Sequence, residues 1–311
     1  SVIMVRRWKD WRFGAYALFT SDFSYEGQEF YELSAGGETL EIDAFLNYRE
    51  TVSRYGISAA RPFGAGWLLG LSISAQNLSL LNSVAITTVF PSASDAFVTE
   101  TVREKVGATG LIFTLGVLKK WEKWNLGMRF SSPHIDVLES GSYYQSRLVS
   151  GTEAEPEEVN EPELRGQYKT PFEVALGGNY HPNENWQLAG DITFNTGVDY
   201  PLYQDFTDSE IILTRFNYRL NAGAQFRPGD KLAYHLGGHY NPSTLDEDAE
   251  ETDLVFYGIH GGIKLFTRFL ETSIGLFYTL GRGESNMENM PVQSEQIYEF
   301  TGLFLGSNYR F

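Results

Sequence analysis

Two kinds of connection alternate along the sequence, and they separate segments in which apolar and polar residues alternate. One kind is short and turn-like, and it occurs at 61–66, 119–124, 181–185, 227–230 and 267–268. The other kind is long, polar and acidic, and it occurs near 21–42, 78–106, 133–165, 199–210, 241–253 and 282–297. Strands joined by short turns at one end and by long loops at the other are typical of a transmembrane β-barrel.

The alternating segments are long for strands. In 107–118, Leu111 and Phe113 share one face, whereas Gly110 and Thr114 share the other. Strands of soluble sandwiches average about five or six residues, and these segments have about ten or more. We therefore predict an all-β transmembrane antiparallel barrel of 12–14 strands, with residues 1–311 as one domain. The twelve segments are 10–20, 43–60, 66–77, 107–118, 122–132, 166–180, 186–198, 211–226, 231–240, 254–266, 269–281 and 298–311.

Composition excludes several classes of protein. There is no apolar run of about 18 residues, so the sequence contains no helical membrane span. Asp and Glu number 40 against 24 Lys and Arg, and the resulting charge of -16 would repel nucleic acid. The absence of cysteine excludes disulfides, thiolate metal sites and thiol catalysis.

Tryptophans lie beside the short turns, where their rings suit the headgroup level of a membrane. They are Trp8, Trp11, Trp121, Trp124 and Trp186. The chain closes on an alternating apolar strand that ends in Phe311, similar to the C-terminal signal of bacterial outer-membrane barrels. We therefore expect the protein in the bacterial outer membrane, in contact with membrane lipids and lipopolysaccharide. Arg6 to Trp11 repeats the pattern of 119–124, so we expect Ser1 to lie inside a strand.

Three blocks resemble the FadL/TodX family of outer-membrane transporters for hydrophobic compounds. They are 115–141, with its Trp124-to-Pro133 strand, the Pro-led hairpin 170–191, and the early strand 11–20. The resemblance implies a fourteen-stranded barrel that takes up hydrophobic small molecules passively, without a bound cofactor. The family's N-terminal hatch has no counterpart in this sequence, and one further strand before Ser1 would complete fourteen.

By alternation, a mixed set of charged side chains projects into the lumen, and Leu188, Ile192 and Phe216 face lipid. Buried charges need partners, so the lumenal set either forms self-satisfied ion pairs or contributes to ligand passage. The candidates for passage are Arg129, Asp191, Arg215, Arg219, His235 and His260, within a set that also includes Glu173, His239, Lys264, Glu271 and Arg310.

His235 and His260 form a separate candidate. A hairpin centred near residue 247 would place them opposite each other, with Cβ atoms about 5 Å apart. His239 lies about 13 Å along the strand and would not complete a metal site. We therefore expect no metal. Because the histidines face the lumen and no serine–histidine pair lies near the lipid boundary, we also expect no enzyme activity.

Apolar residues of the second long loop are candidates for capturing a ligand from outside, or alternatively for packing between loops. They are Leu78, Leu80, Leu81, Phe90, Pro91 and Phe97. Gly14 in the early strand marks a possible kink through which the ligand would leave sideways, the alternative being a continuous wall.

The acidic loops are expected to be solvated and disordered, with cation bridges to lipopolysaccharide as the alternative. They contain Glu153, Glu155, Glu157, Glu158, Glu161 and Glu163, and Asp246, Glu247, Asp248, Glu250, Glu251 and Asp253. Passive uptake of hydrophobic small molecules is the predicted function. The alternative is a scaffold or partner subunit of a larger outer-membrane complex.

Overall fold

The computed structural model describes residues 2–35, 38–91, 96–151, 156–207, 209–242, 255–286 and 293–309, and these form antiparallel strands. In the described residues there is no helix of the length and apolarity needed for a membrane span. The strands are β1 (Val2–Trp8), β2 (Trp11–Ala35), β3 (Glu38–Pro62), β4 (Trp67–Phe90), β5 (Ala96–Lys120), β6 (Trp124–Ser131), β7 (Ile135–Val149), β8 (Glu157–Leu164), β9 (Glu173–Asn183), β10 (Trp186–Asn195), β11 (Val198–Pro201), β12 (Ile211–Thr214), β13 (Asn217–Phe226), β14 (Leu232–Pro242), β15 (Val255–Phe266), β16 (Leu270–Asn286) and β17 (Gln293–Tyr309).

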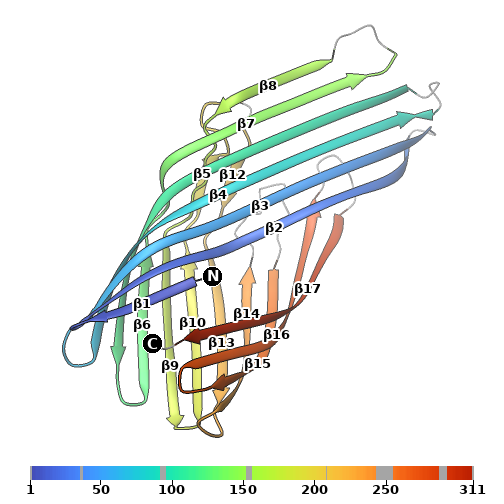
Figure 1. Cartoon of the computed structure of the whole chain (residues 1–311). Helices are drawn as coiled ribbons and strands as arrows, with labels where there is room; N and C mark the ends of the chain where they lie inside the picture. Colours follow the sequence, from blue (N-terminus) through green and yellow to red (C-terminus); the bar gives the residue numbers. More distant parts are fainter. Residues whose placement is uncertain are drawn as a thin grey trace.

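Thirteen strands follow one another in a single sheet that curves into a barrel wall (Figure 1). Their order is β1-β2-β3-β4-β5-β6-β9-β10-β13-β14-β15-β16-β17. All twelve predicted segments contribute strands to this wall, and β1 is the further strand that the sequence around Ser1 predicted. The predicted barrel of 12–14 antiparallel strands is therefore confirmed.

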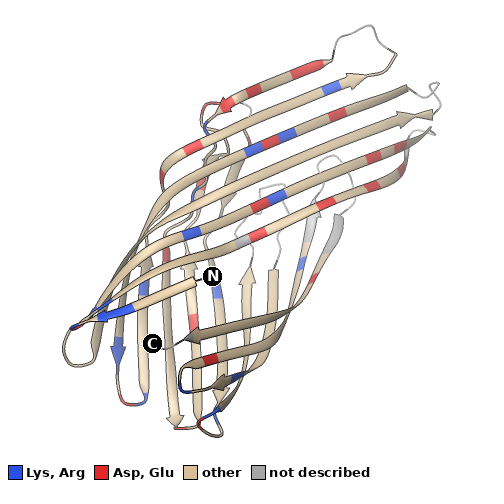
Figure 2. Cartoon of the chain, in the orientation of Figure 1, with Lys and Arg blue, Asp and Glu red and all other residues tan. Residues whose placement is uncertain are grey.

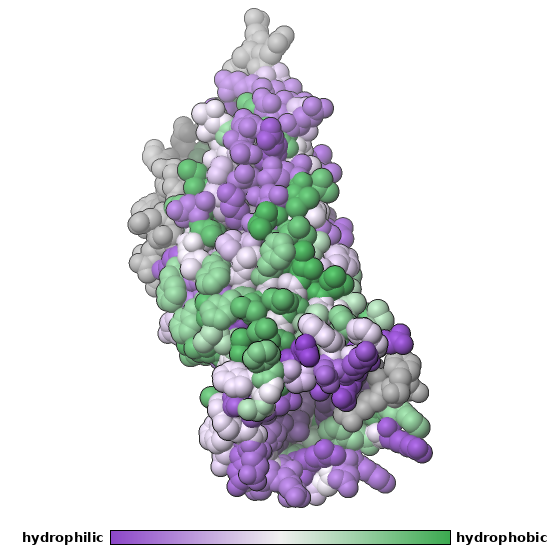
Figure 3. Space-filling view, turned by 90° about the vertical axis from the view of Figure 1, so that its left-hand side faces the viewer, coloured by the Kyte–Doolittle hydropathy of each residue, from purple (hydrophilic) through white to green (hydrophobic). Residues whose placement is uncertain are grey.

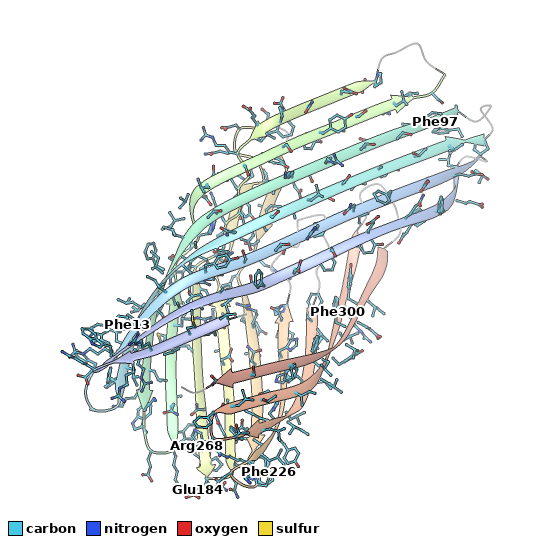
Figure 4. The ribbon with its side chains drawn as sticks, viewed as in Figure 1. Phe13, Phe97, Glu184, Phe226, Arg268 and Phe300 are labelled. Carbon is cyan, nitrogen blue, oxygen red and sulfur yellow. The ribbon has the colours of Figure 1, made fainter. Side chains whose placement is uncertain are left out.

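The short turns share one rim of the wall, as predicted. Each neighbouring pair of strands is antiparallel, so the turns at 61–66, 181–185 and 227–230 come to the same end. Glu184 and Phe226, labelled in Figure 4, lie together at this lower rim. Phe311, which ends the last predicted strand, lies outside the described residues, as does Arg310.

The outer face of the wall carries the predicted apolar set. Phe113, Leu188 and Phe216 are 46%, 44% and 61% exposed, and alternation puts Leu111 and Ile192 on the same outer face. Figure 3 shows hydrophobic surface gathered in a band across the middle of one face, with hydrophilic residues above and below. An apolar band on the outside of an antiparallel barrel is the mark of outer-membrane proteins, so the wall spans a membrane.

The predicted inward set lies on the opposite face. Asp191 lies on the same face of β10 as the buried Thr193 and Asn195, and Arg219 is the register partner of Thr193. Arg215 lines a cavity inside the barrel. The two predicted faces are therefore confirmed.

Several connections that we expected to be loops are strands instead, which corrects the sequence prediction for 21–42, 78–106, 133–165 and 282–297. β2 and β3 each run for 25 residues, far beyond the wall. Together with β4, β5, β7 and β8 they form a projecting sheet, seen at the upper part of Figure 1. The outer face of this sheet is solvated and carries polar residues. The sequence of these strands therefore resembles that of a polar loop.

The acidic residues of the third long connection also belong to this sheet. Glu157, Glu158, Glu161 and Glu163 lie in β8, which pairs with β7, so the expected disordered loop is wrong for these four. Glu153, Glu155 and the acidic run 246–253 lie outside the described residues.

The wall and the projecting sheet separate at Pro133. Both β6 and β7 pair with β5. β6 pairs with residues 114–120 of β5, and β7 pairs with residues 98–111. Between them, Pro133 has no backbone N–H to donate to a ladder. β6 then continues into the wall through β9, whereas β7 pairs with β8, and the sheet divides here.

A short hairpin folds back into the space that this division opens. We call residues 198–214, which contain β11 and β12, the insert. It is attached to the segment after β8, because the Gln167 N–H donates to the Leu202 carbonyl at 2.8 Å and the Gln204 N–H to the Arg165 carbonyl at 3.0 Å.

The insert completes the buried core of the molecule. Val52, Leu78 and Val106 from the inward face of the wall pack with Leu202 and Tyr203 of the insert. Tyr203 is 1% exposed, and its hydroxyl donates to the Ser142 carbonyl at 3.1 Å. The insert is thus held inside the barrel by apolar contact, not only by its two ends.

Candidate functional site

A cavity of about 810 Å³ lies inside the barrel, beneath the insert. Side chains of β3, β4 and β5 line one side, and the start of β9, the end of β10 and β13 line the other. The roof is made by the insert and by the segment that precedes β9. The lining residues used below are Tyr48, Glu50, Val52, Arg54, Leu78, Leu80, Gln167, Tyr168, Thr170, Glu173, Tyr200, Leu202, Arg215 and Arg219.

One side of the cavity is apolar. Val52 and Leu78 are register partners on β3 and β4, and Leu80 follows Leu78 on the same face. Tyr168 and Leu202 close this side from the roof. These side chains offer an apolar surface to a ligand inside an otherwise polar lumen.

The other side of the cavity is polar and rich in arginine. Glu173 accepts hydrogen bonds from both Arg129 and Arg219, with an Arg219 Nη2 to Glu173 Oε2 distance of 2.7 Å. Arg54 donates from Nε to Ser74 Oγ at 2.8 Å and lies near Thr114. Two arginines share one carboxylate on this side, and Arg54 on the facing strand β3 is bound only by hydroxyls among the described residues, so this end of the cavity is cationic.

Three buried polar atoms around the cavity have no hydrogen-bond partner among the described residues. They are Gln167 Oε1, Thr170 Oγ1 and Arg219 Nε. Gln167 is only 6% exposed, so its carboxamide oxygen is costly to leave unpaired. The cavity is therefore built to hold polar atoms at one end and apolar atoms at the other.

The tyrosines of the roof are held in their neutral form. Burial, reinforced by the negative charge of Glu50, raises the pKa of Tyr168 to about 12. Burial also raises the pKa of Tyr200 and Tyr203 above the ordinary value. The roof thus presents uncharged hydroxyls and rings to the cavity at neutral pH.

A second cavity of about 600 Å³ lies against the inward face of the last strands. Its lining includes His239 from β14, Phe256 from β15, Phe277 from β16 and Phe300 from β17. Figure 4 labels Phe300 on the last strand. Glycines opposite these rings make the room, since a Cβ on Gly302 would lie 2.4 Å from the Phe277 ring.

The structure brings three of the predicted passage residues together. Arg215 and Arg219 line the first cavity, and Arg129 reaches it through Glu173. Asp191 lies lower on the inward face, where its Oδ1 accepts a hydrogen bond from Asn221 Nδ2 at 2.8 Å. Among the described residues, no group of three His, Asp or Glu is placed to hold a metal ion.

The expected pairing of His235 with His260 is wrong. The register places His235 opposite Gly262 and His260 opposite Gly237, so the two histidines are diagonal neighbours. His235 pairs two positions further from the hairpin than a centre near residue 247 would give, at Gly262 instead of His260. Each imidazole lies over a glycine of the neighbouring strand.

The remaining candidates lie away from the cavity. Gly14 pairs continuously with Val5 and Ser58, so of the two alternatives the described pairings around it show the continuous wall. The irregularity in this strand is a register shift between Phe19 and Ser21.

Phe90 and Phe97 lie at the far tip of the projecting sheet, on opposite faces of the β4–β5 hairpin, and Figure 4 labels Phe97 there. Among the apolar residues of the same connection, Leu78 and Leu80 reach the cavity. Leu81 points to the other face of β4.

Gln167, Tyr168 and Tyr200 are site residues that the sequence did not reveal. Tyr200 comes from the predicted loop 199–210, and Gln167 and Tyr168 come from the start of the predicted strand 166–180, which is irregular as far as Glu173. The position of both segments depends on long-range contacts. The aromatic residues Tyr200, Tyr203 and Phe206 within a supposedly solvated loop were the available signal, because solvated loops seldom carry such a cluster.

No family model and no curated protein sequence matches the chain. Solved structures do match it. The toluene transporter TodX of Pseudomonas putida superposes with a TM-score of 0.61 at 14% identity, over 98% of this chain and 80% of that one. A FadL homologue of Pseudomonas aeruginosa gives 0.56 at 12% identity, over 96% and 76%. The toluene transporter TbuX of Ralstonia pickettii gives 0.56 at 14% identity, over 99% and 80%.

These matches cover nearly the whole chain and share its long antiparallel strands. With the apolar outer band and the single rim of short turns, they identify the architecture that the sequence blocks predicted. The chain therefore has a FadL-like fold, that of an outer-membrane β-barrel.

Proposed function

We propose that the protein mediates passive uptake of hydrophobic small molecules across the outer membrane. The observation that carries the proposal is the first cavity, in which an apolar side faces a cationic side inside a membrane-spanning wall. Two of the matched structures are transporters of toluene, which supports the same kind of cargo for this fold. The proposal requires no chemical step.

The projecting sheet supplies the capture surface in this proposal. Its inward face carries Leu46 and Val84, which are register partners, with Ile86 and Val102 beside them. This face continues into the cavity through Leu80, two positions before Asn82 on β4. Between Val84 and Leu80 this face carries Asn82 and Glu104, whose side chains are joined by a 3.1 Å hydrogen bond. A hydrophobic molecule that lands on the sheet therefore passes one polar row, beside the Tyr48 ring, before it reaches the cavity.

The bulge in β2 is the proposed place for sideways exit. Thr20, between the shifted residues Phe19 and Ser21, lines the cavity, and its hydroxyl donates to the Val52 carbonyl at 3.1 Å. A bulge leaves one residue unpaired and bends its strand, so the wall is weakest at this point.

Two neighbouring leucines allow a matched test of uptake. Leu80 lines the cavity, whereas Leu81 lies on the opposite face of the same strand. Replacing Leu80→Asn puts an amide against the bound molecule, and we expect binding of a fluorescent long-chain fatty acid or of toluene to weaken about tenfold, or about 1.4 kcal/mol. Leu81→Asn makes the same chemical change outside the cavity and should bind as the unmodified protein does.

The same pair separates transport from the scaffold role. Uptake of the labelled probe into cells should fall with Leu80→Asn at unchanged barrel abundance. If neither probe binds the unmodified protein, or if both variants bind alike, uptake through this cavity is refuted and the scaffold role is favoured.

A further inference from the structure

A groove of about 740 Å³ lies on the outer wall, on the lipid side and close to the rim of short turns. It crosses β5, β6, β9 and β10, and it begins beside Trp67 at the start of β4. Its lining is almost entirely apolar, and the deeper edge is formed by Met128, Leu176 and Ile192, which are register partners on three neighbouring strands. It is separate from both cavities of the lumen.

Glycines make the groove. Gly178 and Gly190 are paired on the outer face of β9 and β10, one row nearer to the turns than Leu176 and Ile192. A side chain at Gly190 would meet only the Asn221 carbonyl, 3.3 Å from the new Cβ. At Gly178 the Leu126 side chain covers the backbone, since its Cδ2 lies 2.6 Å from where a Cβ would be, so the open floor of the groove is the backbone at Gly190.

A lysine lies at the end of the groove. Lys119 Nζ is 4.9 Å from the centre of the Trp67 ring and 5.5 Å from that of Trp121, and it donates to the Ala65 carbonyl. Among the described residues no carboxylate lies within salt-bridge distance of this ammonium. Tryptophan rings mark the headgroup level of a membrane, so the charge lies where lipid phosphates lie.

We propose that this groove binds one phospholipid of the periplasmic leaflet, with an acyl chain over Gly190 and its phosphate on Lys119. Inside a bilayer an apolar groove is filled by hydrocarbon. The ammonium group of Lys119 favours a lipid whose headgroup is anionic. Lys123 adds positive charge at the same turn, and basic residues are marked blue at the lower end of β5 and β6 in Figure 2. Lipopolysaccharide occupies the opposite leaflet from this rim.

The test measures retention of phosphatidylglycerol by the purified protein in detergent, using native mass spectrometry. We expect one phosphatidylglycerol per barrel. Gly190→Leu fills the groove and should abolish retention, whereas Gly261→Leu adds the same side chain to the outer face of β15, where contacts are ordinary, and should retain the lipid. A gel-shift assay confirms that each barrel is folded.

The headgroup part is tested by a second matched pair. Lys119→Gln should weaken retention about fivefold, or about 1 kcal/mol, whereas Lys120→Gln on the opposite face should not. Dioleoylglycerol, which lacks the phosphate, should compete poorly with phosphatidylglycerol. Equal retention by Gly190→Leu and Gly261→Leu, or by the two lysine variants, would overturn the proposal. Because Leu80 lies inside the barrel, this outcome is independent of the uptake test.

Discussion

Tyr203 shows how one residue joins distant parts of the chain. Its ring packs within contact distance of Tyr143 and Phe206, and its hydroxyl donates to a β7 carbonyl. Gly141 is required beside this ring, because a Cβ there would lie 2.7 Å from a ring carbon of Tyr203. Gly166 is required nearby, because a Cβ there would lie 2.6 Å from the Ser140 carbonyl oxygen. None of these contacts has a local signature in the sequence.

Tyrosine ionisation should loosen the roof of the cavity at high pH. Burial raises the pKa of Tyr168 to about 12, whereas the pKa of an exposed tyrosine in an unfolded chain is about 10. The folded state keeps the proton of Tyr168 to a higher pH than the unfolded chain does. The contribution of the neutral phenol to folding stability is therefore complete below about pH 10 and is lost as the pH rises through about 12.

An absorbance titration of tyrosinate should show a late class of tyrosines that loses one member in Tyr168→Phe. Ionisation of all tyrosines together near the ordinary value would contradict the burial of the roof.

At the scale of elements, period-two alternation predicted the wall strands well, because lipid outside and a polar lumen inside impose opposite demands on alternate residues. The same reasoning failed for the projecting sheet. In 21–35 the outward residues of β2 include Asp22, Glu26 and Glu32, and these acidic side chains made the region resemble a loop. The insert could not be placed at all, since its position follows from the division of the sheet at Pro133.

Removing the insert should open the lumen without unfolding the wall. The ends of 198–214 are adjacent, because the Val198 N–H donates to Thr214 Oγ1 at 2.9 Å, so a short Gly-Ser linker can join Gly197 to Arg215. β10 and β13 pair with each other independently of the insert. The shortened protein should admit small polar solutes into liposomes several times faster than the unmodified protein, in a swelling assay. Unchanged solute flux from a folded barrel would show that the insert does not close the lumen.

Across the whole molecule, charge is separated along the barrel axis. Acidic residues run along β8 and the far ends of β2 and β3, whereas basic residues mark the turn between β5 and β6 (Figure 2). The excess of acidic residues that gives the net charge of -16 therefore lies mainly at the end that carries the projecting sheet. Long extensions at one end and short turns at the other fix an orientation, with the projecting sheet outside the cell and the turns in the periplasm.

Single cysteines test this orientation cleanly, because the chain has none of its own. Glu158 lies on β8 of the projecting sheet, and Glu184 lies in the turn between β9 and β10. Both side chains are exposed, so a membrane-impermeant maleimide can reach either once it is on the correct side. On intact cells it should label Glu158→Cys, and it should label Glu184→Cys only after the outer membrane is permeabilised. The reverse labelling pattern would show that the barrel has the opposite orientation. The direction of capture and the leaflet that supplies lipid to the outer groove would then both be reversed.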